Sequence, residues 1–143
     1  MKSKILIIGQ APPAVKQEVP YDTTMLYDWL IEVGITKDTA QDMFEFEAVC
    51  GDFTGFSEKG GHRKPSLSEM DAHWDSVLEE KVQLADKIIL LGNVSRDYFY
   101  SKPKTYSCGL KVLELIHPSK RNSFLYSKTK DAVISSLKEF INS

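Results

Sequence analysis

The stretch Lys4–Pro13, KILIIGQAPP, is the clearest indication of the fold class of this chain. Lys4–Ile8 is a compact, mostly apolar run that glycine and proline end, which is the pattern of a buried strand in a parallel sheet. Lys111–Asn122, KVLELIHPSKRN, repeats this pattern near the other end of the chain. Ligands of open α/β sheets bind just beyond the carboxyl ends of the strands. We therefore expect the two loops that follow these strands, Gly9–Pro13 and His117–Asn122, to line one crevice.

Helical and strand patterns alternate along the rest of the chain. Two further apolar runs predict strands, and with the runs above the predicted strands are Lys4–Ile8, Phe44–Val49, Lys87–Leu91 and Lys111–Ile116. Between and after them the sequence predicts helices from Asp22 or Thr23 to Gly34, from Ser66 to Leu84, from Gly92 to Tyr100, and from Ser127 to Ile141. Alternation of this kind gives a parallel sheet covered on both faces. The predicted fold is a three-layer α/β/α sandwich around a four-stranded parallel sheet, in a single domain spanning residues 1–143.

Apolar stripes and end signals define the predicted helices. The first helix carries Met25, Leu26, Trp29, Leu30 and Val33 on one face. The second begins at a capping box, Ser66–Glu69, because the serine and the glutamate satisfy each other's backbone groups. Its predicted inward residues are Met70, Trp74, Val77, Leu78 and Leu84, and those of the last helix are Val133, Ile134, Leu137, Phe140 and Ile141.

Composition excludes several classes of protein. A chain of 143 residues with 42% hydrophobic and 27% charged residues is typical of a globular protein and not of a disordered one. No apolar run is long enough to cross a bilayer, and Gly9-Gln10 interrupts the first one too early for a secretory signal. The two cysteines, Cys50 and Cys108, form no metal or redox motif. These features predict a cytoplasmic protein that does not bind membranes.

The net charge of −2 conceals an asymmetry along the chain. Residues 1–100 carry 10 Lys and Arg against 17 Asp and Glu, whereas residues 101–143 carry 8 against 3. A basic carboxyl-terminal third that includes the second loop suits a phosphate backbone. The alternative, a solvated helix face, is the one that charge alone favours.

Five short motifs resemble the uracil-DNA glycosylase superfamily, and their order resembles its iron–sulfur-containing branch. That branch has a Gly-Glu-Ala-Pro-Gly loop, then Pro-Phe-Val-Gly, and here Gly9–Pro13 leads to Pro20–Thr23. His62–Pro65, within a long polar loop from Gly51 to Pro65, is similar to an Asn-Arg-Lys-Pro-like loop before a helix. Leu90–Gly92 and the His-Pro-Ser of residues 117–119 complete the set, which spans nearly the whole chain.

The chain also departs from the pattern of that family. The branch's four cluster cysteines are missing, so neither an iron–sulfur cluster nor any other cofactor is expected. Gln10 stands where one branch has Glu, and Ala11 where another has Asp. The asparagine with which the family recognises uracil at the end of the second strand has no match here, and Glu47 is the nearest residue, within about one position of alignment.

The resemblance implies roles for the first and last loops. Breaking the glycosidic bond leaves negative charge on the base, and a donor aimed at the base oxygen stabilises it, which is the expected role of His117. Gln10 would orient the attacking water through its side-chain carbonyl, with Asp22 or Glu18 as substitutes. The base-binding residues would be Gly9, Ala11, Pro12, Tyr21 and Glu47. Tyr21 would stack on the base, or else only cover the first helix.

Glu47 raises a question of selectivity. An ionised carboxylate only accepts hydrogen bonds, so it suits an exocyclic amino group better than the carbonyl oxygens of uracil. If Glu47 lines the pocket, the base need not be uracil. The alternative is a strand residue that faces solvent.

DNA contacts are expected from the basic residues near the two loops. Ser119 can donate to a phosphate, while Lys120 and Arg121 supply charge. Arg63 and Lys64, in the long loop, would contact the phosphate backbone of the DNA.

Together these features predict a monomeric DNA glycosylase that hydrolyses the N-glycosidic bond of uracil or another damaged base, by base flipping, in base excision repair. One alternative is a degenerate member of the superfamily that binds nucleic acid or a free base without excision. Another is an unrelated α/β nucleotide-binding protein, although no phosphate-binding fingerprint supports it.

Overall fold

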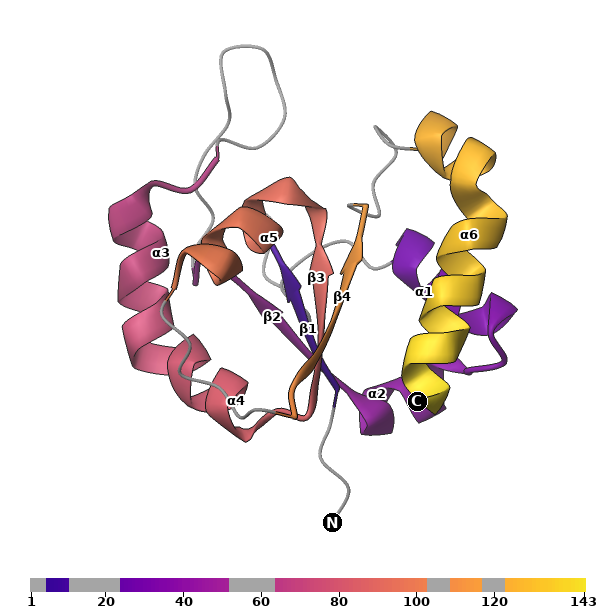
Figure 1. The fold of residues 1–143 in the computed structure, drawn as a ribbon, viewed down its shortest axis with the longest axis horizontal. Coiled ribbons are helices and arrows are strands. Elements are labelled where there is room, and N and C mark those ends of the chain that lie inside the picture. Colours follow the sequence, from indigo (N-terminus) through magenta and orange to yellow (C-terminus); the bar gives the residue numbers. More distant parts are fainter. Residues whose placement is uncertain (1–4, 11–23, 52–63, 103–108, 117–122) are drawn as a thin grey trace.

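The computed structural model describes residues 5–10, 24–51, 64–102, 109–116 and 123–143, without the side chains of residues 24, 25 and 123–129. Four strands form one sheet: β1 (Ile5–Gly9), β2 (Phe44–Ala48), β3 (Lys87–Leu91) and β4 (Lys111–Leu115). All pairings are parallel, in the order β2-β1-β3-β4 (Figure 1). The predicted four-stranded parallel sheet is confirmed.

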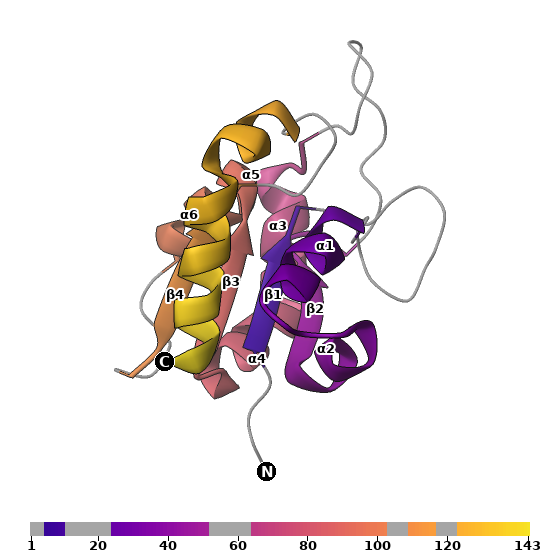
Figure 2. The ribbon, with the colours of Figure 1, turned by 90° about the vertical axis from the view of Figure 1, so that its right-hand side faces the viewer.

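Helices cover both faces of the sheet, as predicted. They are α1 (Thr24–Glu32), α2 (Lys37–Met43), α3 (Leu67–His73), the π-helical turn η1 (Trp74–Leu78), α4 (Glu79–Leu84), α5 (Gly92–Ser101) and α6 (Ser123–Asn142). Figures 1 and 2 show α1, α2 and α6 on one side of the sheet, and α3, η1, α4 and α5 on the other. No helix among the described residues has the length and apolar character that a membrane span requires.

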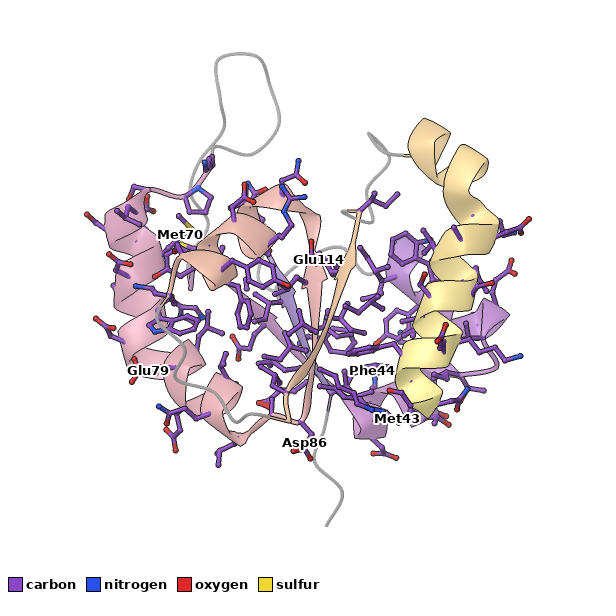
Figure 3. The ribbon with its side chains drawn as sticks, in the orientation of Figure 1. Met43, Phe44, Met70, Glu79, Asp86 and Glu114 are labelled. Carbon is purple, nitrogen blue, oxygen red and sulfur yellow. The ribbon has the colours of Figure 1, made fainter. Side chains whose placement is uncertain are left out.

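Alternation along the strands builds two separate cores. In β1, Ile5 and Ile7 pack toward α1 and α6 with Trp29 and Phe44, whereas Leu6 and Ile8 pack toward the α3 side. Figure 3 shows the two sets of side chains filling the space on either side of the strands. A central strand buried on both faces explains the near-continuous apolar run that marked it in the sequence.

Several element boundaries differ from the predicted ones. β1 runs to Gly9, one residue past the predicted end at Ile8, and its predicted first residue, Lys4, lies outside the described residues. β2 and β4 each end one residue before the predicted Val49 and Ile116. α6 begins at Ser123 rather than Ser127, since nothing between these residues breaks a helix. α2 was not predicted, because Ala40 is its only buried residue and it has no apolar stripe; Thr36 caps it by accepting from the amide of Thr39.

The prediction that Leu84 points to the core is wrong, since its side chain is 72% exposed. The π-helical turn η1 holds more residues per turn than an α-helix, and this changes which later residues face inward. Leu78, Val82 and Ala85 are the residues that pack against the sheet. The inward positions of Met70, Trp74 and Leu78 are confirmed.

Replacing Trp29 tests the larger core. Trp29 is fully buried, so Trp29→Ala is expected to lower the free energy of unfolding by about 3–5 kcal/mol, because it leaves a large cavity. Ile31 on the same helix is 61% exposed and serves as the control, with an expected change within about 0.5 kcal/mol for Ile31→Ala. Urea unfolding measures both, and equal effects of the two variants would contradict the described packing.

Candidate active site

The four strands end at one edge of the sheet. Gly9 of β1 lies beside Ala48 of β2, and Leu91 of β3 lies beside Leu115 of β4. Because the strands are parallel, the segments that follow them leave from this carboxyl edge, which is uppermost in Figure 1. Both predicted site loops therefore start at this edge, one after β1 and the other after β4.

Most of the predicted site residues fall outside the described part of the chain. These are Ala11, Pro12, Tyr21, Arg63, His117, Ser119, Lys120 and Arg121, along with the predicted substitutes Glu18 and Asp22. The structure does describe Gly9, which is buried, Gln10, which is half-buried, and Lys64, which is exposed. It also describes Glu47, whose surroundings decide what it can do.

Backbone pairing connects the ends of β1 and β2. The register places Ile8 beside Glu47 and Gly9 beside Ala48. The amide of Val49 donates to the carbonyl of Gly9 over 2.9 Å, which extends the pairing past the last residue of β2. Gly9 directly precedes Gln10, so the first predicted loop begins at a point held by the exit of β2.

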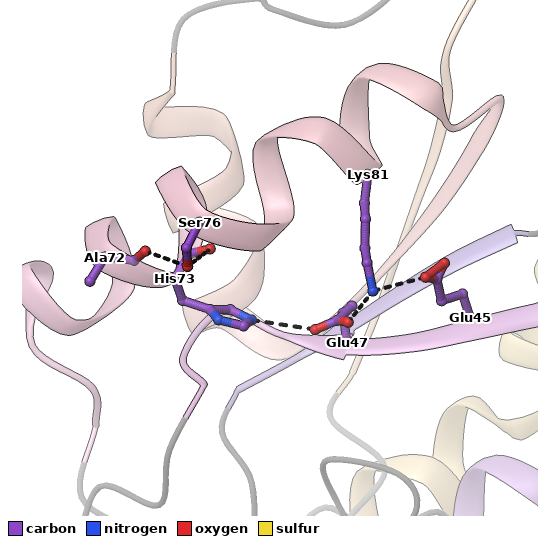
Figure 4. Close-up of polar contacts among 6 residues, drawn as sticks. All are labelled: Glu45, Glu47, Ala72, His73, Ser76 and Lys81. Atoms are coloured by element: carbon purple, nitrogen blue, oxygen red, sulfur yellow. Dashed lines mark hydrogen bonds and ion pairs between the residues drawn. The ribbon is translucent and has the colours of Figure 1, made fainter.

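Glu47 lies in a charged cluster between β2 and the helix that follows the long loop (Figure 4). Its Oε1 is 3.3 Å from Nε2 of His73, and its Oε2 accepts from the Nζ of Lys81. Since an ionised carboxylate only accepts, the Nε2 of His73 is the donor in this pair. The Nζ of Lys81 also lies 2.8 Å from Oε1 of Glu45. We refer to Glu45, Glu47, His73 and Lys81 as the β2 cluster.

The β2 cluster favours the ionised state of Glu47. Burial opposes ionisation, but the hydrogen bonds from His73 and Lys81 outweigh it and hold the pKa of the Glu47 carboxyl below its ordinary value. Lys81 is also desolvated, yet its bonds to Glu45 and Glu47 raise the pKa of its ammonium. The side chain of Glu47 is 17% exposed, so it does not face solvent. Its role in base recognition stays a prediction, and both of its oxygens already accept one bond.

The lowered pKa of Glu47 predicts how pH affects stability. A carboxyl with a depressed pKa in the folded state stabilises the protein above its unfolded pKa, and this contribution is lost as the pH falls through the folded pKa. The difference in free energy of unfolding between the native protein and Glu47→Gln is therefore expected to be constant above about pH 5 and to shrink as the pH falls below about 4. Urea unfolding across this range measures it. A difference that does not vary with pH would contradict the ionised cluster.

A second polar network joins α3 to the end of α5. Oδ1 of Asp71 accepts from the hydroxyl of Tyr98 over 2.6 Å and from the Nζ of Lys102 over 2.8 Å. The same Nζ lies 5.7 Å from the ring centre of Trp74. Burial, followed by the bond to Asp71, raises the pKa of Tyr98 to about 12. Through these bonds to Asp71, the network joins the end of α5 to α3.

Sequence reasoning identified Glu47 but missed its partners. His73 and Lys81 are eight positions apart, and at 3.6 residues per turn an α-helix places them about 80° apart around its axis. The π-helical turn between them absorbs about one extra residue, which reduces this angle to about 20° and puts both side chains over β2. The hydrophobic periodicity of the sequence does not predict such a turn.

The sequence matches a known family over nearly its whole length. A family model described as "Uracil DNA glycosylase superfamily" matches residues 1–140. The chain belongs to this superfamily. The predicted membership of the superfamily is thereby confirmed, and it makes DNA the expected partner of this chain.

A solved structure supports the fold assignment of the superfamily member. The crystal structure of wild-type SMUG2 from Pedobacter heparinus is similar over 99% of this chain and 77% of that chain, with a TM-score of 0.60 and 16% identity. At this identity the likeness bears on the fold, and it confirms the predicted α/β architecture. No curated protein matches the chain in sequence.

Proposed function

We propose that this superfamily member is a DNA glycosylase that hydrolyses the N-glycosidic bond of uracil or another damaged base after flipping it from the stack. The observation that carries the proposal is the family match over residues 1–140, combined with a parallel sheet whose carboxyl edge gives rise to both motif loops. His117 would donate to the base oxygen as negative charge grows there. Gln10 would hold the attacking water.

The described backbone supports a part for Gln10. Gly9 is buried in β1 and its carbonyl accepts from the amide of Val49, so Gln10 leaves the sheet from a fixed point. A glutamine carbonyl can orient a water molecule but carries no charge to balance the positive sugar. General-base assistance contributes typically about 10²–10⁴-fold, so we expect a slow enzyme.

The remaining predicted residues complete the proposed site. Gly9, Ala11, Pro12 and Tyr21 would enclose the flipped base, and Glu47 would lie at its edge. Ser119, Lys120, Arg121 and Arg63 would contact DNA phosphates. A cytoplasmic location and a monomeric state are further parts of the proposal.

The proposal is tested by an excision assay at low salt. Single- and double-stranded oligonucleotides would carry uracil, hypoxanthine, xanthine or a mismatch, and alkali would cleave any abasic site that forms. Product from one of these substrates supports a glycosylase and identifies its base. The absence of the first-loop acid favours a second candidate, a superfamily member that binds DNA without excision. Salt-sensitive binding with no product from any substrate would support that candidate.

The basic residues after His117 predict how DNA binding depends on salt. Each phosphate contact contributes about −0.9 to the slope of log K against log salt for duplex DNA, so replacing both Lys120 and Arg121 by Ala should make the slope shallower by about 1.8. A charge-matched control replaces Lys111 and Lys138, two exposed lysines, one at the amino end of β4 and the other in the last turns of α6. Equal changes of slope in the two double variants would contradict a DNA surface at the carboxyl edge.

A further inference from the structure

The face of β2 that lies toward α3 carries charges at positions where the neighbouring strand carries core residues. The register pairs Glu45 with Leu6 and Glu47 with Ile8, and both of these β1 residues are buried. Both glutamates find their counter-charge in Lys81, and Glu47 also binds His73. On this face of the edge strand β2, ion pairs and hydrogen bonds therefore take the place of apolar side-chain packing.

A gain in folding stability does not by itself explain why charged residues occupy these positions of β2. A partly buried ion pair gains little over well-packed apolar residues of the same volume, because its groups must be desolvated. Directed bonds do fix geometry, since each donor and acceptor has a preferred distance and angle. The π-helical turn at Trp74–Leu78 adds to this, because it brings His73 and Lys81 over the same strand.

The His73 end of the β2 cluster meets the exit of β2. A Cβ built on Gly51 would lie 3.0 Å from Nδ1 of His73, closer than ordinary contact allows. The imidazole therefore stands where a side chain at position 51 would lie, while its other ring nitrogen binds Glu47. His73 thus binds Glu47 at one end of the segment from Glu47 to Gly51 and faces the Cβ position of Gly51 at the other. The middle of that segment, Val49, is bonded to Gly9.

We propose that Glu47 and His73 are positioning residues that fix the β2 exit from Glu47 to Gly51 and, through the Val49–Gly9 hydrogen bond, the point from which Gln10 leaves the sheet. The inference rests on the proposed function in giving Gln10 a catalytic part. The pair acts on the reaction through the backbone of two strands. Small displacements of a reacting group lower the rate strongly, so the pair affects turnover more than DNA binding.

Amide exchange of Val49 tests the positioning directly, without reference to activity. In His73→Ala, exchange of the Val49 amide is expected to become faster by about tenfold or more, because the segment loses its anchor. His73→Gln keeps an amide donor for Glu47 and should restore much of the protection. Lys102→Met is the matched control: it breaks a part-buried ion pair on the same side of the sheet that does not touch β2.

A double-variant cycle tests the contact with Gly51. Gly51→Ala places a methyl group against the imidazole and should speed exchange of the Val49 amide in the native background. In the His73→Ala background the ring is absent, so the same substitution should add little. In excision assays His73→Ala should lower kcat by roughly tenfold to a hundredfold with KM for DNA little changed.

The outcomes separate the two proposals. Unchanged Val49 exchange in His73→Ala, equal acceleration in Lys102→Met, or simple addition of the Gly51 and His73 effects would overturn the positioning pair. A rise in KM with unchanged kcat would also overturn it. If the native protein excises no base, the proposed function fails, and the exchange measurements still decide whether the pair holds Gly9.

Discussion

His117→Ala should lower the rate of base excision by about 10²–10³-fold under single-turnover conditions, because a donor to a developing oxyanion is typically worth that much. The base departs carrying negative charge, and a positioned N–H lowers the free energy of that state more than the free energy of the bound ground state. Duplex binding should change little, since the donor acts mainly in the transition state. The measurement is a time course with protein in excess over an oligonucleotide that the native protein cleaves.

Two comparisons make the His117 prediction specific. His117→Gln retains an amide donor and should fall between the native protein and His117→Ala. Urea unfolding of each variant should match that of the native protein, which excludes loss of fold as the cause. A His117→Ala variant that excises at the native rate would remove His117 from the proposed mechanism.

Gln10→Glu should raise the excision rate by roughly 10²-fold or more, because it supplies the carboxylate that the first loop lacks. The substitution preserves shape and adds a negative charge, which both orients water and balances the positive sugar. The gain should disappear as the pH falls through about 4–5, where a glutamate becomes protonated, and the native rate should lack this dependence. Pre-steady-state rates between about pH 4 and 8 measure both effects.

The control for Gln10→Glu is Gln10→Ala, which removes the carbonyl and should be slower than the native protein. A Gln10→Glu variant that is no faster than the native protein at any pH would place the attacking water elsewhere. Asp22 and Glu18, the other carboxylates considered for this part, would then become the residues to replace.

Much of the fold follows from local sequence patterns. Buried parallel strands need continuous apolar runs, so Ile5–Gly9 and Lys87–Leu91 stand out in the sequence. The start of α3 was also predictable, because the Ser66–Glu69 capping box forms as expected. α2 escaped prediction because a helix with one buried residue has no apolar period, and its cap, Thr36, is a weak signal alone.

The site was less predictable than the fold, for a physical reason. Motif residues such as Gln10 and His117 stand next to strand ends, and a strand end can be located from sequence. The partners of Glu47 come from a helix whose phase depends on a π-helical turn, and such a turn arises from tertiary packing. Local periodicity therefore located Glu47 without showing that it binds His73 and Lys81.

Hydrolysis of an N-glycosidic bond in DNA by this superfamily member would leave a free base and an abasic site. The most direct measurement is release of the free base, identified by mass, from modified oligonucleotides incubated with excess native protein. We expect one free base for each abasic site, with both products formed more slowly in His117→Ala. Retained DNA binding with no free base from uracil, hypoxanthine, xanthine or mismatched substrates would contradict it.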